Sequence, residues 1–342
     1  MSRIEPTNFA LALSDFLFHY LPDQRGLSTN TVASYSDALS QFLVFCEKKM
    51  NIRREKLTIN HLSFSMVEEF LDWLENEMHC GVSTRNQRHA ALNSFFKFLQ
   101  YKNPGHIALF QQIRAIPRKT SKVQSVNHLS IEAVETLIKM PDTNTVYGRR
   151  DFMLLSLMYE SAARVSEMGN LKISDIRFDR RGTAVHIVGK GNKPRIVPLI
   201  EPVADCLKKY ISSEKERRQC SNNDILFCNR SGKPITRAGI SYILKKYSDT
   251  ARQQYPGLFP EKIHPHIMRH SRAMHWLESG IDLQYIKDLL GHADLSTTQI
   301  YAQLNLEMKR KVLQNVQPIN IPDCPSWTDD KPLLEWLQSL SK

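Results

Sequence analysis

The spacing of apolar residues constrains the fold of this chain more than any other feature. Over most of the 342 residues, apolar side chains recur at helical spacing. The period changes clearly to two at residues 183–199, where two alternating segments flank a Gly-Lys-Gly-Asn turn. That pattern is a strong signal for a β-hairpin. The sequence therefore predicts a mainly α-helical protein with a small β-sheet.

The first third of the chain contains three segments with amphipathic helical spacing. They cover residues 28–49, 63–78 and 83–102. The third segment places Arg85 and Arg88 in a polar first half and its apolar residues in the second half. A polar helix end of this kind fits a DNA-facing surface and a solvated helix start equally well.

Residues 114–128 have the composition of a linker. The segment contains four basic residues, one proline and little periodicity. We place a domain boundary here, so that an N-terminal helical domain covers residues 1–113. A basic linker can follow a phosphate backbone, which makes Arg118 and Lys119 candidate DNA contacts, although most basic linkers are merely solvated.

A second domain, again mostly helical, is predicted over residues 129–320, and a tail follows at 321–342. The predicted elements of this part are a helix at 129–141 capped by Ser130, a long and a short helix within 149–176, the hairpin at 183–199, a short extended pair at 224–236, helices from about 238 onward, and a tail helix at 329–340.

The charge and composition indicate the class of partner. The net charge of +11 suits a polyanion such as nucleic acid, although many basic proteins bind none. No apolar run approaches the roughly 18 residues that a membrane span requires, and the first residues lack a signal-peptide layout. The six cysteines include no CxxC pair, which indicates free thiols in a reducing cytoplasm. We therefore expect a cytoplasmic protein with no membrane partner.

Several common chemistries lack their motifs. The sequence has no GxxxxGK[ST] or GxGxxG phosphate loop, no HExxH and no Cys/His zinc spacing. The glycines of the hairpin turn are not a phosphate loop, because no helix follows them. We therefore expect any catalysis to use side chains alone, with no metal and no cofactor.

A group of cationic, imidazole and phenol side chains remains as a candidate site. Taken singly, each has an ordinary structural alternative as a buried ion pair, a solvated turn, a helix cap or a packed aromatic residue. Together they supply what a metal-free phosphoryl transfer would use. The group consists of Arg164, Lys190, His266, Arg269, His292 and Tyr301.

The chemistry of a phosphodiester explains why these residue types fit together. Under attack, a phosphodiester spreads negative charge over its non-bridging oxygens, which planar guanidinium groups can match with paired hydrogen bonds. A tyrosine has an ordinary pKa near 10, so it needs a base or a strong positive field to attack at neutral pH. The leaving alkoxide needs a proton, which a lysine at a hairpin tip can deliver.

Four ordered motifs resemble one known family. The segments ARVSEMGNLKISDI, VGKGNKPRIVPL, HPHIMRHSRAMHWLESGIDLQYIKDLLGH and LSTTQIYAQ closely resemble the tyrosine recombinase (phage integrase) family, especially its Xer-like branch. The resemblance covers roughly residues 129–310, and the N-terminal helices are similar to the family's core-binding domain. It implies a two-domain clamp around duplex DNA, made of a small four-helix, SAM-like bundle and a mixed α/β catalytic domain.

The resemblance also implies roles for individual residues. Tyr301 would be the nucleophile and Lys190 the general acid, with Arg164, His266, Arg269 and His292 completing the active site. Glu167 matches a supporting acid of the family. Two departures are Ala163, where the family more often has a Gly-Leu or Gly-Met pair before the arginine, and Arg272, where an aromatic residue is common. Arg272 and Lys193 are added as candidate phosphate contacts.

The implied function is conservative site-specific DNA recombination. The family cuts duplex DNA through a 3′-phosphotyrosine, works as a tetramer on two synapsed sites and passes through a Holliday junction. Accessory or directionality proteins are expected partners, and the protein would be nucleoid-associated when bound to DNA. A C-terminal part longer than in the housekeeping Xer type favours a mobile-element integrase or transposase.

Three alternatives stay open at this point. The first is Xer-type dimer resolution, the second is nicking and religation of the type IB topoisomerase kind, and the third is a binding-only architectural protein. The tail leaves a further choice. Its apolar stripe needs a docking surface, because so short a helix is marginal alone in water. That surface lies either on its own domain or, as is common in this family, on a neighbouring protomer.

Overall fold

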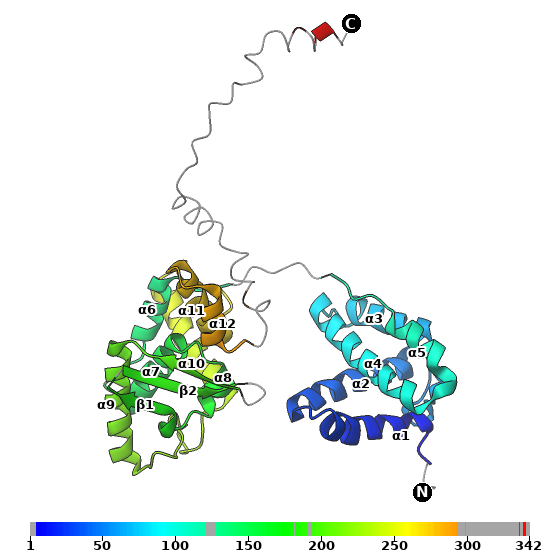
Figure 1. The fold of residues 1–342 in the computed structure, drawn as a ribbon, viewed down its shortest axis with the longest axis horizontal. Coiled ribbons are helices and arrows are strands. Elements are labelled where there is room, and N and C mark those ends of the chain that lie inside the picture. The colour runs from blue at the N-terminus through cyan, green and yellow to red at the C-terminus, as the bar shows by residue number, and fades with distance from the viewer. Residues whose placement is uncertain are drawn as a thin grey trace. The chain divides into compact units, whose positions relative to one another are not determined.

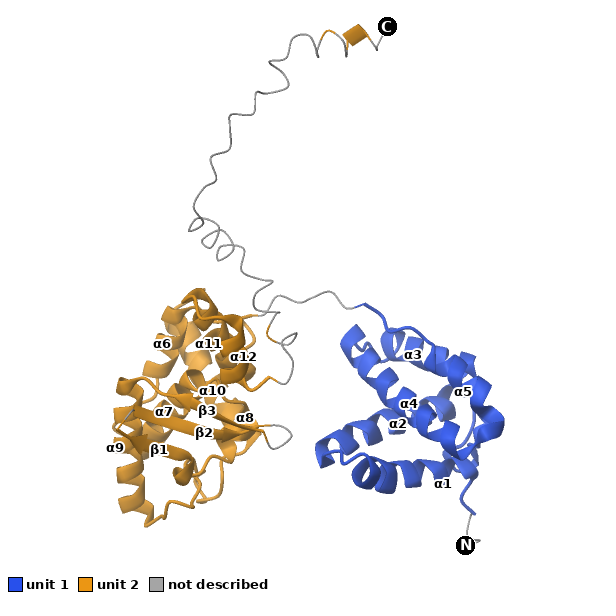
Figure 2. Cartoon of the chain, viewed as in Figure 1, with its two compact units in different colours: residues 1–124 blue, residues 125–342 orange. Residues whose placement is uncertain are grey.

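A computed structural model of the chain divides it into two compact units, residues 1–124 and 125–342 (Figure 2). The division lies within the predicted linker segment. The described residues are 5–120, 127–180, 182–189, 193–292, Thr298, Glu335, Gln338 and Ser339.

The fold is mainly helical with one small sheet, which confirms the predicted fold class (Figure 1). Across the described part of the chain, no helix combines the length and the apolar character needed to cross a membrane.

Unit 1 consists of helices only, within the residues described. The predicted helices at 28–49, 63–78 and 83–102 are α2, α3 and α4, whereas α1, η1 and α5 were not predicted. With these additions the unit has more than the four helices that the resemblance implied. The elements are α1 (Asn8–Asp15), the π-helix η1 (Phe16–Gln24), α2 (Thr29–Lys49), η2 (Arg54–Lys56), η3 (Ile59–His61), α3 (Phe64–Asn76), α4 (Val82–Lys102), η4 (Pro104–His106) and α5 (Ile107–Arg114).

Local capping explains where these helices begin. The Ser28 hydroxyl accepts a hydrogen bond from the backbone N–H of Thr31, so α2 begins where its sequence predicts. The Ser63 hydroxyl does the same for α3. Helix α4 differs, because it begins at Val82 after Gly81 and places Ser83 inside its first turn.

Aromatic rings fill the core of unit 1. Phe16 packs edge-on to Phe95 at 5.1 Å between ring centroids, and Phe42 does the same to Phe70 at 5.3 Å. All four side chains are buried. Each stabilises the fold by roughly 1.5–3 kcal/mol relative to an exposed ring, and the two pairs hold η1 against α4 and α2 against α3.

Unit 2 combines helices with a three-stranded antiparallel sheet in the order β1-β2-β3. The predicted hairpin is β2–β3, whereas β1 and α9 were not predicted. The elements are α6 (Ile131–Lys139), α7 (Val146–Glu160), α8 (Val165–Gly169), η5 (Ile173–Asp175), β1 (Ile176–Asp179), β2 (Gly182–Val188), β3 (Pro194–Pro198), α9 (Glu201–Arg218), α10 (Arg237–Gln254), α11 (His266–Glu278) and α12 (Leu283–Leu290).

The extended pair predicted at 224–236 is present only as a minimal antiparallel pairing, in which the N–H of Asn229 donates to the carbonyl of Lys233 at 2.8 Å and the N–H of Ile235 donates to the carbonyl of Phe227 at 3.1 Å. Its residues form only two isolated bridges, Lys172 with Ile225 and Cys228 with Pro234. Turns and bends occupy most of the segment, and Arg218 at the end of α9 donates to the carbonyls of Ile225 and Leu226.

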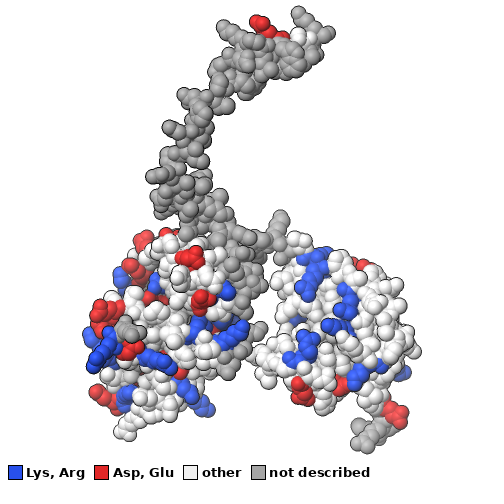
Figure 3. All heavy atoms as spheres, in the orientation of Figure 1, with Lys and Arg blue, Asp and Glu red and all other residues white. Residues whose placement is uncertain are grey.

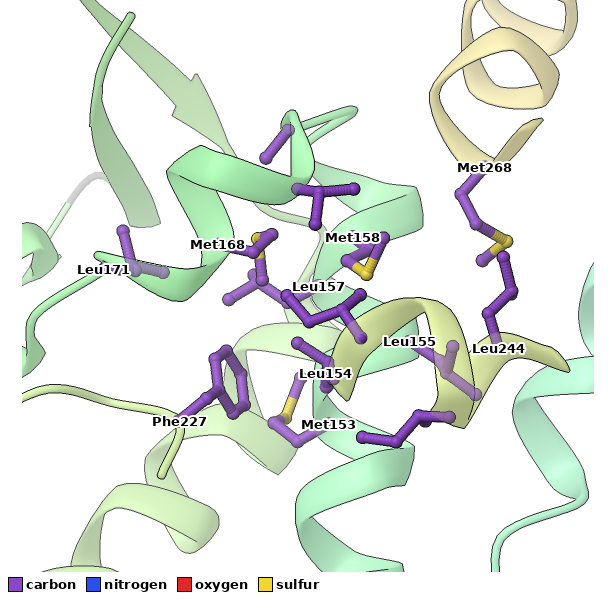
Figure 4. Close-up of a cluster of buried hydrophobic side chains, with 14 of the residues drawn as sticks. Met153, Leu154, Leu155, Leu157, Met158, Met168, Leu171, Phe227, Leu244 and Met268 are labelled. Atoms are coloured by element: carbon purple, nitrogen blue, oxygen red, sulfur yellow. The ribbon is translucent and has the colours of Figure 1, made fainter. Parts of the chain in front are cut away.

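Helix α7 is the centre of the unit 2 core. Consecutive side chains on all its faces are buried, including Met153, Leu154, Leu155 and Leu157 (Figure 4). From Met153 to Met158 every residue is buried, as expected for a helical segment in an interior. Because α7 is surrounded, its C-terminal end has a fixed place, and the residues that follow Glu160 start from that place.

Candidate active site

Arg164 lies in the sharp turn between α7 and α8. Ala162 has a left-handed backbone conformation, with φ of 47°, and is fully buried. Arg164 then caps α8, and its backbone N–H donates to Glu167 Oε2 at 2.7 Å while its Nη1 donates to Glu167 Oε1 at 2.8 Å. Glu167 therefore holds both the main chain and the guanidinium of Arg164.

Glu167 has a second partner, Arg195 of β3. Arg195 Nη1 donates to Oε1 at 3.0 Å and Nη2 donates to Oε2 at 2.7 Å. Burial opposes ionisation of Glu167, but the hydrogen bonds and charges of Arg195 and then Arg164 outweigh it and lower its pKa. The carboxylate is thus an ionised bridge between two guanidinium groups.

Arg195 was not among the predicted site residues, although the sequence holds a signal for it. In β3 the buried positions alternate with exposed ones, so Arg195 shares the inward face with Val197. An arginine on the inward face of a strand is rarely buried without a partner. The strand period could therefore have indicated a paired arginine here, but the partner could not be identified from it.

Arg269 of α11 connects two helix ends. Its guanidinium is buried, with Nη1 donating to the carbonyl of Ala162 at 2.8 Å and Nη2 donating to the carbonyl of Leu290 at 2.7 Å. These bonds join the end of α7 to the end of α12, and they fix Arg269 near the α7–α8 turn that carries Arg164.

His266 is the first residue of α11 and is exposed. Its ring lies 6.4 Å from that of His264 and 6.3 Å from that of His270, centroid to centroid. The pKa of His266 is lowered, first because partial burial disfavours the charged ring. The positive charges of His264, Arg269, Arg237 and Arg164 lower it further. His266 is therefore a neutral imidazole at neutral pH.

His292 follows the end of α12. Gly291 takes a left-handed conformation there, with φ of 63°, and ends the helix as a glycine commonly does. His292 Nδ1 lies 2.8 Å from the hydroxyl of Thr298, and the tautomer decides which atom donates. The pKa of His292 is lowered to about 4. Burial is the largest cause, and the positive charges of Arg269, Arg164 and Arg195 add to it.

Unit 2 thus brings five of the predicted residues together: Arg164, Glu167, His266, Arg269 and His292. They meet where the α7–α8 turn, the start of α11 and the end of α12 come together. Lys190 and Tyr301 lie outside the described residues, as does the tail at 321–342 apart from Glu335, Gln338 and Ser339, which are helical. Two guanidinium groups beside neutral imidazoles suit an anionic group with several oxygens.

Two of the expected DNA contacts are occupied within the protein. Arg85 is buried in α4, 3.6 Å from Glu75. Arg272 pairs with Glu160 at 2.8 Å, and its guanidinium lies over the rings of Tyr159 and Trp276. Both guanidinium groups thus have partners inside their own unit, and their contacts with phosphate stay predictions.

The other expected contacts lie nearer the surface. Arg88 is half-buried and donates to Gln41, whereas Lys119 is exposed and pairs with Glu75. Arg118 and Lys193 are exposed. Lys193 borders a hollow of about 470 Å³ that His292 also lines. Figure 3 shows Lys and Arg side chains spread over the displayed face of unit 1.

The low pKa of His292 predicts a pH dependence of stability. Below pH 6.5 the imidazole of His292 becomes protonated in the unfolded chain, whereas in the folded protein it stays neutral down to about pH 4. The contribution is therefore complete above pH 6.5 and is lost as the pH falls toward 4. We expect His292→Gln to make the free energy of unfolding less dependent on pH in this window, as measured by urea denaturation.

The matched control for that measurement is His19→Gln, which changes an exposed histidine in unit 1. It should leave the slope unchanged. An equal change of slope in both variants would contradict the assignment to His292.

Two family models match the chain. The model described as "Phage integrase family" matches residues 127–308. The model described as "Phage integrase, N-terminal SAM-like domain" matches residues 15–103. The first match spans the unit that contains the candidate site, and the second lies within the helical unit 1.

Relatives in sequence and in structure agree with these matches. The chain is 34% identical to the tyrosine recombinase XerD of Listeria monocytogenes over 310 residues, covering 90% of this chain and 98% of that protein. It is 31% identical to the tyrosine recombinase XerC of Staphylococcus epidermidis over 306 residues, covering 90% and 97%.

Among solved structures, the XerH site-specific recombinase bound to its difH substrate has a TM-score of 0.64 at 22% identity, covering 86% of this chain and 81% of that one. The Tn1549 transposon integrase in complex with transposon right end DNA has a TM-score of 0.66 at 16% identity, covering 89% and 99%. At these identities the likeness shows a shared fold.

Proposed function

This chain belongs to the phage integrase family, and from that premise we propose that it cuts and rejoins duplex DNA at specific sites through a phosphotyrosine formed by Tyr301. It is a tyrosine-type site-specific recombinase. The observation that carries the assignment of the site is the convergence of Arg164, Arg269 and His292, held together by Glu167 and by backbone carbonyls.

The proposed first step is binding of the scissile phosphate. Arg164 and Arg269 supply positive charge and planar donors for its non-bridging oxygens. Both are held by contacts within unit 2, so little reorganisation is needed when charge develops on those oxygens. His292 is neutral, and its ring N–H can donate to the same oxygens.

The proposed second step is transfer of the phosphoryl group. The Tyr301 oxygen attacks phosphorus, and the neutral, exposed His266 is available to take the phenol proton. The bond to the 5′ oxygen breaks, and Lys190 donates a proton to that oxygen. A 5′-hydroxyl of the partner strand then attacks the 3′-phosphotyrosine and releases Tyr301. One phosphoester replaces another at each step, so no nucleotide is consumed.

The experiment that tests this proposal is strand transfer from a suicide half-site. A nicked duplex loses the short strand after cleavage and traps the covalent adduct, and a second labelled duplex with a 5′-hydroxyl then accepts the trapped strand. A recombinase gives both the adduct and the transferred strand. An adduct that does not transfer its strand to the second duplex indicates the topoisomerase-like alternative, and the absence of any adduct indicates a binding protein.

The proposed biological role is movement of a mobile element, with Xer-type dimer resolution as the alternative. The supporting observation is length, because the match to Listeria XerD covers 98% of that protein but only 90% of this chain. Sequencing the DNA that flanks the gene tests the role. Inverted repeats or an element boundary there support movement of an element, and flanks without them favour dimer resolution.

The proposed assembly is a homotetramer on two DNA sites, in the cytoplasm and associated with the nucleoid, with accessory proteins where direction is controlled. The proposed domains are residues 1–113, the linker 114–128, the catalytic domain 129–320 and the tail 321–342. Surface positions proposed to contact phosphates are Arg88, Arg118, Lys119 and Lys193.

The tail carries a prediction about assembly. We expect truncation after Asp323 to leave folding and single-site binding intact but to weaken cooperative binding to paired sites and to slow recombination. The reason is that the apolar stripe of the tail helix needs a surface to dock on, and a neighbouring protomer provides one. Gel-shift titration of single and paired sites measures the effect.

A point variant and its control refine that test. Trp336→Ala removes the largest side chain of the stripe, whereas Gln338→Ala changes an exposed position of the same helix. The first should reproduce the loss of cooperativity and the second should not. Unchanged cooperativity in the truncated protein would show that the tail plays no part in assembly on DNA.

A further inference from the structure

The side chain of the buried Arg195 lies against Glu167, Gly189 and Gly291. Each of these residues is bonded to, or directly precedes, a proposed catalytic residue. Its two terminal nitrogens hold both oxygens of Glu167, and Glu167 holds the main chain and side chain of Arg164. Arg195 lies on β3, where it pairs with Ile187 of β2, so its backbone is fixed by the sheet. Its side chain therefore links the sheet, through Glu167, to the α7–α8 turn.

The same side chain packs against Gly291, which directly precedes His292. A Cβ on Gly291 would come to 3.0 Å of Arg195 Cδ and 3.4 Å of Arg195 Nη1. Gly291 also has φ of 63° and ends α12. The backbone that leads into His292 thus rests directly on the Arg195 side chain.

A third contact leads to the hairpin turn. A Cβ on Gly189, which directly precedes Lys190, would lie 3.5 Å from Arg195 Nη1 and 3.5 Å from Glu167 Oε1. The N–H of Gly189 donates to the carbonyl of Lys193 at 2.9 Å, which closes the base of the turn. The residue before Lys190 therefore stands over the Arg195–Glu167 pair.

We propose that Arg195 is a positioning residue that sets the mutual placement of Arg164 and His292 through Glu167 and Gly291. The proposal rests on the proposed function only in treating these two residues as catalytic. Arg195 is itself buried, with 6% of its side chain exposed, and it acts through its neighbours. The planar guanidinium is needed because an ammonium group cannot hold both carboxylate oxygens in one fixed fork.

The first test compares Arg195→Lys with Arg177→Lys. Lysine keeps the charge but loses the fork, and Arg177 is an exposed arginine of the same sheet. We expect Arg195→Lys to slow formation of the covalent adduct by about 100-fold, as displacements near 1 Å can do, with DNA affinity unchanged. Arg177→Lys should stay within about two-fold of the unchanged protein in this assay.

The second test approaches the contact from the opposite side. Gly291→Ala and Gly280→Ala both place a Cβ on a left-handed residue after a helix, with φ of 63° and 84°. The Gly280 Cβ meets nothing within 4 Å, whereas the Gly291 Cβ meets Arg195. Both variants carry backbone strain, so only Gly291→Ala should slow adduct formation more than its loss of thermal stability explains.

A measurement without DNA separates this proposal from the proposed function. Ring resonances of His292, assigned by comparison with His292→Gln, should shift in Arg195→Lys and in Gly291→Ala but not in the two controls. If they shift while no protein forms an adduct, the recombinase function fails and the positioning stands. Should Arg195→Lys not fold, Gly291→Ala carries the test by itself. Unchanged His292 resonances, or an adduct that forms in these variants at the rate of the controls, overturn the proposal.

Discussion

Tyr301→Phe should abolish the covalent protein–DNA adduct while leaving DNA affinity within a few-fold. The phenol oxygen is the atom that bonds to phosphorus, so its removal eliminates the reaction, whereas it contributes little to ground-state binding. A denaturing gel with a labelled suicide substrate measures the adduct, and a gel shift measures affinity.

Tyr242→Phe is the matched control for this variant. It removes the hydroxyl of an exposed tyrosine on α10 and should form the adduct at the rate of the unchanged protein. A full-strength adduct from Tyr301→Phe would show that another side chain is the nucleophile. Loss of affinity together with loss of the adduct would point instead to a folding or binding role.

Lys190→Ala should slow cleavage of a normal phosphodiester by about two to four orders of magnitude, the usual contribution of a general acid. The leaving 5′ oxygen needs a proton, and the low pKa of His266 leaves that imidazole unprotonated at neutral pH. In a substrate with sulfur at the 5′ bridging position, the leaving group is a thiolate that needs no added proton. This substrate should largely restore the cleavage rate of the variant. Single-turnover cleavage of both substrates measures the effect.

Lys209→Ala, at an exposed lysine of α9, is the control for charge removal and should cleave both substrates normally. Equal slowing of Lys190→Ala on both substrates would show that Lys190 does not protonate the leaving group. His266 would then be the next candidate for the acid, and His266→Gln with the sulfur substrate would test it.

Local signals in the sequence determined much of the fold. Ser28, Ser63 and Ser130 are the caps of α2, α3 and α6, and alternation identified the β2–β3 hairpin. Caps and periods depend on residues a few positions apart, so they are visible without a tertiary structure. Helix α9 was missed because half of the residues in its sequence, EPVADCLKKYISSEKERR, are charged, which leaves few apolar residues to show a helical period.

In the candidate site, the sequence identified the residues but not all of their partners. Motif order gave Arg164, Glu167, His266, Arg269 and His292, which the structure places together. The same reasoning did not reveal the acidic partners of Arg85 and Arg272, because nothing in the local sequence says which acid a guanidinium will meet.

The sequence by itself thus determined which residue types are present, how they are spaced along helices and strands, and which family the motifs resemble. Only the tertiary structure decided which charges are buried together. Arg195 reaches Glu167 across 28 residues, and Arg269 reaches the carbonyl of Ala162 across 107. A buried charge is stable only with a partner, and that partner is chosen by how distant elements pack, a choice that no local pattern records.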